Sequence, residues 1–203
     1  MATLLLLARH AAHDEIGRVL SGRGDGAGLS AVGRAQATAL ADRLRRERPL
    51  ALHVSPRRRA RETAEALQVA LDLPALVEPA LDEIDFGAWT GRDFTTLSDD
   101  PAWRSWNEQR ATARPPGGEA MHEAVSRVLR WSETLPHRHP GAAILAVSHA
   151  DVIKATLLAH LGLTLDAHWR LDLDPASLSA LELWPGGGRV RFVNETSFLG
   201  GRS

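Results

Sequence analysis

The sequence predicts a three-layer α/β/α fold, in which helices cover both faces of a mostly parallel central sheet. Two apolar runs, Leu4–Ala8 and Ala142–Val147, have the length of buried strands, and each leads directly into a segment that contains a histidine. Segments with the apolar spacing of amphipathic helices lie between and after these runs. Such alternation of strands and helices is typical of parallel sheets with both faces covered.

The length and composition fit a single domain that spans residues 1–203. Hydrophobic residues make up 44% of the chain and charged residues 24%, which is ordinary for a globular protein. The formal net charge of -1 gives no general reason to expect a nucleic-acid or membrane partner. The chain has no cysteine, which excludes disulfides, thiolate catalysis and cysteine-bound metals. The sequence predicts no particular oligomeric state.

The apolar N-terminus differs from a signal peptide in two respects. Its apolar run is shorter than the core of about 7–15 residues in such peptides, and no basic segment precedes it. Elsewhere no window approaches the roughly 20 apolar residues of a membrane span. We therefore expect a cytoplasmic protein whose first segment is a buried strand.

The first half of the chain alternates strand and helix patterns. A strand at about 3–8 is followed by a glycine-rich loop at 21–26 and by a helix that begins near Ser30, a favourable N-cap residue. A second strand is predicted over 50–54. The dipeptide Ser55-Pro56 has the residue types of an N-cap and a first helical position, so the next helix is expected to begin there.

Residues 93–118 are less regular than the rest of the chain. They contain several charges, Trp103 and Trp106, and end in two prolines and two glycines. This composition predicts a lid-like excursion rather than part of the sheet core, with the two tryptophans more often packing than contacting substrate. Substrate specificity is expected to depend on this excursion and on the loop after His10, because loops commonly carry binding residues.

The last part of the chain returns to regular elements. Helices are predicted over 119–135 and 151–161, with a strand over 142–147 between them. Two β-type segments, 178–184 and 190–193, flank a proline- and glycine-rich turn, and this spacing predicts a C-terminal β-hairpin.

His10 and His149, which follow the two apolar runs, are the first candidate site residues. Ligand sites of open parallel sheets lie beyond the carboxyl ends of the strands, so these imidazoles are expected to meet at one site. Arg9 beside His10 indicates an anionic substrate, and phosphate fits the planar donor fork of arginine best. A histidine that attacks phosphorus must be neutral, and a neighbouring arginine favours that form.

Two further segments carry residue types that such a site needs. Residues 57–61 contain four arginines at the start of a predicted helix, where one of them can face the sheet end and complete an anion clamp. Residues 82–89 contain three carboxylates beside apolar and aromatic residues. A partly buried carboxyl group has a raised pKa and can protonate a leaving oxygen near neutral pH.

Six motifs in this order resemble those of the histidine phosphatase superfamily, the phosphoglycerate mutase-like proteins, and in particular its small phosphatase branch. Together they span most of the chain. They are Arg9-His10-Ala11, Leu29–Ala37, Ser55–Ala64, Glu83–Trp89, Gly117-Gly118-Glu119 and Val147-Ser148-His149.

The resemblance implies a role for each matching residue. His10 would be the nucleophile that forms a phosphohistidine, and Arg9, Arg59 and His149 would bind the phosphoryl group. Glu83 would protonate the leaving group and then activate water. The substrate would be a small phosphorylated metabolite, and the resemblance implies no metal and no organic cofactor.

The sequence defines the roles of other residues near the expected pocket less sharply. Ser21 and Arg23 lie on the loop that would overhang the pocket, and either is a candidate substrate-binding residue. The remaining arginines of the cluster, Arg57, Arg58 and Arg61, are expected to face solvent.

The chain also departs from the family pattern. Ala11 replaces the usual glycine, His13 stands where threonine is common, and Thr90 replaces a glutamate. These changes put the substrate and the efficiency in doubt. Another branch of the superfamily uses an aspartate directly after the second histidine. Here Asp151 comes one residue later, so Glu83 is preferred as the acid.

Three functions therefore stay open at this point. The preferred one is a metal-independent phosphomonoester hydrolase that acts through phosphohistidine. The alternatives are a phosphoglycerate-type mutase and a catalytically weak protein that binds a phosphorylated ligand. The chain lacks the length for the longer insertions of glycolytic mutases, which favours the phosphatase.

Overall fold

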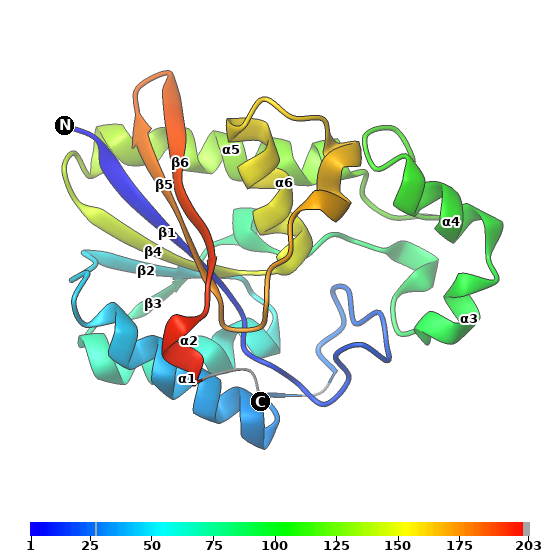
Figure 1. Cartoon of the computed structure of the whole chain (residues 1–203), viewed down its shortest axis with the longest axis horizontal. Helices are drawn as coiled ribbons and strands as arrows, with labels where there is room; N and C mark the ends of the chain where they lie inside the picture. Colours follow the sequence, from blue (N-terminus) through cyan, green and yellow to red (C-terminus); the bar gives the residue numbers. More distant parts are fainter. Residues whose placement is uncertain (27, 201–203) are drawn as a thin grey trace.

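The computed structural model describes residues 1–26 and 28–200, and its centre is a six-stranded sheet (Figure 1). The strands are β1 (Thr3–Arg9), β2 (Ala51–Val54), β3 (Ala75–Val77), β4 (Ala143–Ser148), β5 (Leu178–Trp184) and β6 (Gly187–Glu195). Their order across the sheet is β3-β2-β4-β1-β5-β6. Strand β4 pairs in parallel with β1 and β2, and β3 in parallel with β2, whereas β5 is antiparallel to both of its neighbours. The prediction of a mostly parallel sheet is confirmed.

Helices cover both faces of this sheet (Figure 1). They are α1 (Ala31–Leu44), α2 (Arg58–Leu71), α3 (Phe94–Ser98), α4 (Pro101–Glu108), α5 (Met121–Arg138) and α6 (Ala150–His160). Short 3₁₀ turns occur at Pro79–Leu81, Gly87–Trp89, Leu165–Arg170 and Ser197–Leu199. Helices α1 and α2 lie on one face, and α5 and α6 on the other.

Strand β1 contributes apolar side chains to both buried faces of the sheet. Its side chains alternate between the faces, as in any strand. Leu5 and Leu7 join the apolar cluster of α5 and α6, whereas Leu6 and Ala8 join the cluster of α1 and α2. All four are at most 1% exposed. A run of apolar residues without polar alternation is therefore what this position in the sheet requires.

The start of α1 is as predicted, because Ser30 is its N-cap and accepts a hydrogen bond from the Gly33 backbone N–H at 3.0 Å. The predicted start of α2 is wrong. That helix begins at Arg58, after an N-cap at Arg57. Ser55 instead continues the sheet, since its N–H donates to the carbonyl of Val147 at 2.9 Å. Because Ser55 is hydrogen-bonded to β4, helix α2 begins later in the sequence than predicted.

The excursion at 93–118 contains α3 and α4, which lie at one end of the molecule away from the sheet (Figure 1). Trp106 is fully buried and belongs to the apolar cluster that also contains Leu5, and its ring meets that of Phe86 edge-on at 6.1 Å. Part of the excursion therefore packs into the core. Its action as a lid stays a prediction.

Smaller differences concern the ends of elements. Strand β3 lacks a counterpart in the prediction, and α5 extends to Arg138 instead of ending at Leu135. The C-terminal hairpin is confirmed, but β6 begins at Gly187, which pairs with Trp184. Across the two ranges that the model describes, no helix combines the length and the apolar character that crossing a bilayer requires.

Candidate active site

The parallel pairing of β1 with β4 brings the two predicted histidines together. Arg9, the last residue of β1, lies opposite Ser148, the last residue of β4. The next residues along the two strands are His10 and His149, whose ring centroids are 5.2 Å apart. The two side chains are almost fully buried. Two residues far apart in sequence therefore form one site at the carboxyl edge of the sheet.

The hydrogen bonds of His10 fix which ring nitrogen carries the proton. Its Nδ1 lies 2.9 Å from the carbonyl oxygen of Ala11, which only accepts, so Nδ1 is the donor. The Arg59 Nε–H donates to the opposite nitrogen, Nε2, at 3.2 Å. Burial, followed by the charges of Arg59 and Arg9, holds the pKa of His10 well below its usual value. The ring is therefore neutral, with its lone pair at Nε2.

Arg59 lies between the two histidines and connects them. One of its Nη atoms donates to His149 Nδ1 at 3.0 Å and to the carbonyl of Gly22 at 2.9 Å. The same atom lies 3.5 Å from a carboxylate oxygen of Glu83. Arg59 is only 4% exposed, because it is the second residue of α2 and faces the sheet end. The predicted pocket arginine is thus beside both imidazoles.

His149 is also neutral, because burial, with Arg59 next in size, holds its pKa well below the usual value. Its Nδ1 accepts from Arg59, so Nε2 carries the proton and donates to Ser55 Oγ at 2.7 Å. His149 is the N-cap residue of α6, so the first backbone N–H groups of that helix lie beside the site. Ser55, which the sequence predicted as a helix cap, instead holds the His149 ring in place through this hydrogen bond.

Arg9 brings a second guanidinium to the pocket wall. One of its Nη atoms donates to the carbonyl of Leu173 at 2.5 Å, which fixes the direction of the side chain. Its Nε is buried and lacks a hydrogen-bond partner within residues 1–26 and 28–200. An anion beside His10 would satisfy this donor.

Glu83 has the properties of a proton donor near neutral pH. Its residue surface is only 9% exposed, and Oε1 accepts from the Ile84 N–H at 2.9 Å. Its other carboxylate oxygen lies 3.5 Å from Arg59 and from His149 Nδ1. Burial, reinforced by the charge of Asp151, raises the pKa of Glu83 to about 7. Glu83 can therefore hold a proton that it gives up near neutral pH.

The alternative acid, Asp151, has the opposite character. It accepts from His168 Nε2 at 2.6 Å and pairs with Arg110 at 3.3 Å. Although burial raises the pKa of Asp151, Arg110 and His168 bring it below the usual value. Asp151 is therefore a carboxylate at neutral pH, and Glu83 is the better proton donor. Sequence reasoning missed Arg110 and His168, because neither belongs to a motif.

A pocket of about 370 Å³ opens at this edge of the sheet, and Arg9, His10, Arg59 and Glu83 all line it. Ser21 lines it as well, although its hydroxyl donates to Glu15 at 3.1 Å.

Arg23, the other candidate from the overhanging loop, is engaged elsewhere. It donates to the carbonyl of Glu83 at 2.8 Å and pairs with Glu119 at 2.9 Å and Asp82 at 3.5 Å. This places Arg23 behind the proposed acid, where it fixes the Glu83 backbone. Its contact with substrate stays a prediction.

The expectation that Arg57 faces solvent is wrong. Its side chain is 20% exposed and forms an ion pair with Asp82 at 2.8 Å, because α2 starts after Arg57 and leaves it beside the acidic segment. The exposed positions of Arg58 and Arg61 are as predicted.

Two of the departures from the family motifs, Ala11 and His13, lie at the site. Ala11 is fully buried and its N–H donates to Thr63 Oγ1 at 3.0 Å. Its φ is negative, so the backbone after His10 has no need of glycine. His13 lines the pocket with its ring centroid 5.4 Å from that of His10. Burial lowers the pKa of His13 to about 4, so it is neutral at pH 7.

Comparison with known proteins agrees with this geometry. The family model of the histidine phosphatase superfamily (branch 1) matches residues 5–196. The bifunctional protein Rv2228c of Mycobacterium tuberculosis is 39% identical over 202 residues, which are 97% of this chain and 55% of that protein. The chain therefore spans about half the length of this relative.

Two further relatives match over most of their own length. Phosphoserine phosphatase 1 of Hydrogenobacter thermophilus is 30% identical over 174 residues, which are 85% of this chain and 82% of that enzyme. The structure of Bacillus stearothermophilus YhfR superimposes with a TM-score of 0.91 at 28% identity, over 98% of this chain and 100% of that one. Fold, motifs and these matches agree: the chain belongs to branch 1 of the histidine phosphatase superfamily.

Proposed function

We propose that this chain hydrolyses phosphomonoesters of small metabolites through a phosphohistidine intermediate on His10. The observation that carries the proposal is the neutral His10 ring, whose Nε2 lone pair lies at a pocket lined by two guanidinium groups. Relatives of this chain include an enzyme named phosphoserine phosphatase, which supports the same class of reaction.

In the first step the Nε2 lone pair of His10 attacks phosphorus, and the bond from phosphorus to the ester oxygen breaks. Glu83 gives its proton to that oxygen, so the product alcohol leaves neutral. The raised pKa of Glu83, about 7, supports this role, because an acid with a pKa near the working pH is the most effective.

The charge that develops on the phosphoryl oxygens is stabilised by groups already in position. Arg9 and Arg59 offer N–H donors, and the helix start after His149 adds backbone donors. Arg59 donates to both histidines. A bound phosphoryl group would take over some of these donors.

In the second step the Glu83 carboxylate accepts a proton from a water molecule as the water oxygen attacks phosphorus. The bond from phosphorus to His10 Nε2 breaks, which releases inorganic phosphate and restores the neutral ring. Glu83 ends the cycle protonated, ready for the next ester.

The test is hydrolysis of p-nitrophenyl phosphate by the wild type and by His10→Ala, with and without a chelator. We expect chelator-resistant activity in the wild type and a loss of at least about 10³-fold in the variant, as for other nucleophile deletions. His137→Ala, an exposed histidine on α5, is the matched control and should keep full activity. Equal activity of the wild type and His10→Ala would overturn the mechanism.

A further inference from the structure

The pocket beside His10 has two chemically different halves. The inner half contains Arg9, His10, Arg59 and Glu83, described above. The outer half is apolar, and it is formed by Ile16, Val19, Leu20, Phe86, Phe94 and Pro175. Ile16, Val19 and Phe94 are partly exposed at the pocket surface. Apolar side chains left open around a concave site are typical of a ligand-binding surface.

Backbone hydrogen bonds hold this outer half in shape. The loop after His10 and the segment before α3 form an isolated antiparallel bridge between Val19 and Asp93. Around it, the Leu20 N–H donates to the carbonyl of Arg92 at 2.9 Å, and the Phe94 N–H donates to that of Arg18 at 2.9 Å. Ile16, Val19 and Phe94 therefore come from two segments that are already joined, so the apolar half is formed before any ligand arrives.

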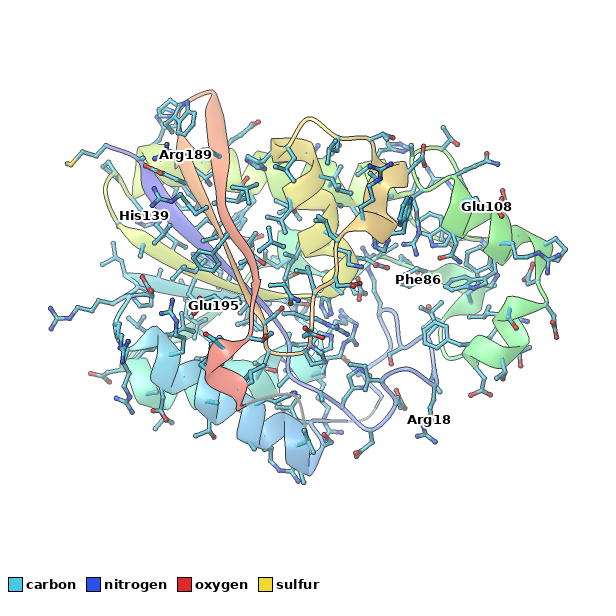
Figure 2. All side chains as sticks on the ribbon, in the orientation of Figure 1. Arg18, Phe86, Glu108, His139, Arg189 and Glu195 are labelled. Carbon is cyan, nitrogen blue, oxygen red and sulfur yellow. The ribbon has the colours of Figure 1, made fainter. Side chains whose placement is uncertain are left out.

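The outer half lacks a cation for a second anionic group. Among the described residues that line the pocket, the arginines are Arg9 and Arg59, and both lie beside His10. Arg23 is occupied by carboxylates and lies outside the lining. Arg18 is exposed and donates to the carbonyl of Asp14 at 3.0 Å, and Figure 2 shows its side chain directed away from the body of the molecule.

The inner half adds negative charge of its own. Asp151 is ionised and lines the pocket, although Arg110 pairs with it at 3.3 Å, and in the proposed mechanism Glu83 becomes a carboxylate after it has protonated the leaving group. A carboxylate or second phosphate on the leaving group would therefore meet like charge and apolar surface, without a partner to compensate for its lost hydration.

We propose that the outer half is a subsite for an uncharged, apolar leaving group, so the enzyme prefers phosphate esters of apolar alcohols to esters that carry a second anion. The inference rests on the proposed function, because it assumes that the phosphoryl group lies at His10. Ile16, Val19 and Phe94 would contact the alcohol part, and each methylene buried there would favour binding.

Binding of non-hydrolysable phosphonates tests the subsite without turnover. Calorimetry on the full chain would compare 3-phenylpropylphosphonate with 2-carboxyethylphosphonate. We expect the phenyl compound to bind at least about tenfold more tightly, the discrimination typical of apolar pockets. Equal affinities, a preference for the carboxylate, or binding of neither compound would overturn the inference.

Two variants and a control make the test specific. Phe94→Ala should remove most of the tenfold preference. Ile16→Arg should reverse it, because it supplies the missing cation and does not depend on the packing of Phe94 against Trp103. Val69→Ala, an 87% exposed position on α2, should bind both phosphonates as the wild type does. A preference that survives in both Phe94→Ala and Ile16→Arg would contradict the subsite.

The matching esters separate this inference from the function itself. If the wild type binds the phenyl phosphonate preferentially but hydrolyses neither 3-phenylpropyl phosphate nor p-nitrophenyl phosphate, the proposed function fails and the subsite is supported. If it hydrolyses 3-phosphooxypropanoate as efficiently as 3-phenylpropyl phosphate, the subsite fails and the hydrolase is supported.

Discussion

The inner and outer halves of the pocket are built by different means. The inner half follows the ends of β1 and β4, where parallel pairing aligns His10 with His149 and hydrogen bonds fix both rings. The outer half depends on a short bridge between two loop segments, at Val19 and Asp93, and presents apolar side chains. In the proposed function, strand ends would fix the reacting groups, and loops would select the alcohol part of the phosphate ester.

The comparison predicts that changes in the inner half abolish turnover, whereas changes in the outer half alter preference. The most severe test after His10→Ala is Arg59→Ala. Arg59 is the donor that reaches both histidines, so we expect a loss of about 10²–10³-fold in kcat/KM, as for other transition-state donors. Arg61→Ala, which removes an exposed arginine from the same helix, is the control. A loss below about threefold in Arg59→Ala would contradict the claim that the inner half is needed for turnover, because the anion would then bind elsewhere.

Glu83→Gln should have the next largest effect. Without the proton donor, kcat for an alkyl phosphate should fall by about 10²-fold or more. In the wild type, kcat should decline as the pH rises above about 7, because Glu83 then loses the proton that the leaving group needs. The pH-rate profile should lose this alkaline limb in Glu83→Gln and keep it in Glu65→Gln, an exposed position. If the alkaline limb persisted in Glu83→Gln, the group that loses its proton would be a residue other than Glu83.

The same carboxyl group predicts how stability depends on pH. The folded chain holds the Glu83 proton up to about pH 7, whereas an unfolded chain releases it near 4.5. Proton binding therefore favours the folded state at low pH, and this advantage disappears between pH 4.5 and 7. Relative to Glu83→Gln, the free energy of unfolding of the wild type should fall by an amount on the order of 3 kcal/mol across this window. Urea unfolding at pH 5 and pH 8 measures it, and parallel curves for the two proteins would contradict the raised pKa.

The smallest expected effect is that of Asp151→Asn. The charge of Asp151 raises the pKa of Glu83, so its removal should move the alkaline limb of the pH-rate profile to lower pH while the limb persists. If the limb instead disappeared in Asp151→Asn and remained in Glu83→Gln, Asp151 would be the acid.

Sequence reasoning predicted the inner half because its residues follow strands. An apolar run followed by a histidine places that histidine at the sheet edge, and two such runs place His10 beside His149. It misplaced Ser55 because a favourable local sequence for a helix cap was outweighed by hydrogen bonds to Val147 and His149, which are far away in the chain. Local propensity contains no information about such long-range partners.

The ion pairs around the site were missed for the same reason. Arg57 pairs with Asp82, and Arg110 with Asp151, through contacts that no periodic pattern in the sequence reports. Specificity was expected to depend on the loop after His10 and on the excursion at 93–118; the loop supplies Ile16, Val19 and Leu20 to the described pocket lining, and the excursion supplies Phe94. The tryptophans of the excursion pack, as predicted, with Trp106 fully buried.

The position of β1 has a consequence for how this chain is made. Of the six strands of this sheet it is synthesised first, yet it lies between β4 and β5, which begin at Ala143 and Leu178. The apolar residues of β1 can therefore pair only after β4 and β5 have been synthesised. Contacts between segments so far apart in the sequence require long loops to close, which slows folding. Until then the emerging chain exposes an unpaired apolar strand, and His149, which follows β4, has not yet been made. In the proposed function the catalytic site can thus be completed only after β4 has been made, and the strand that leads into the proposed nucleophile exposes apolar surface until then.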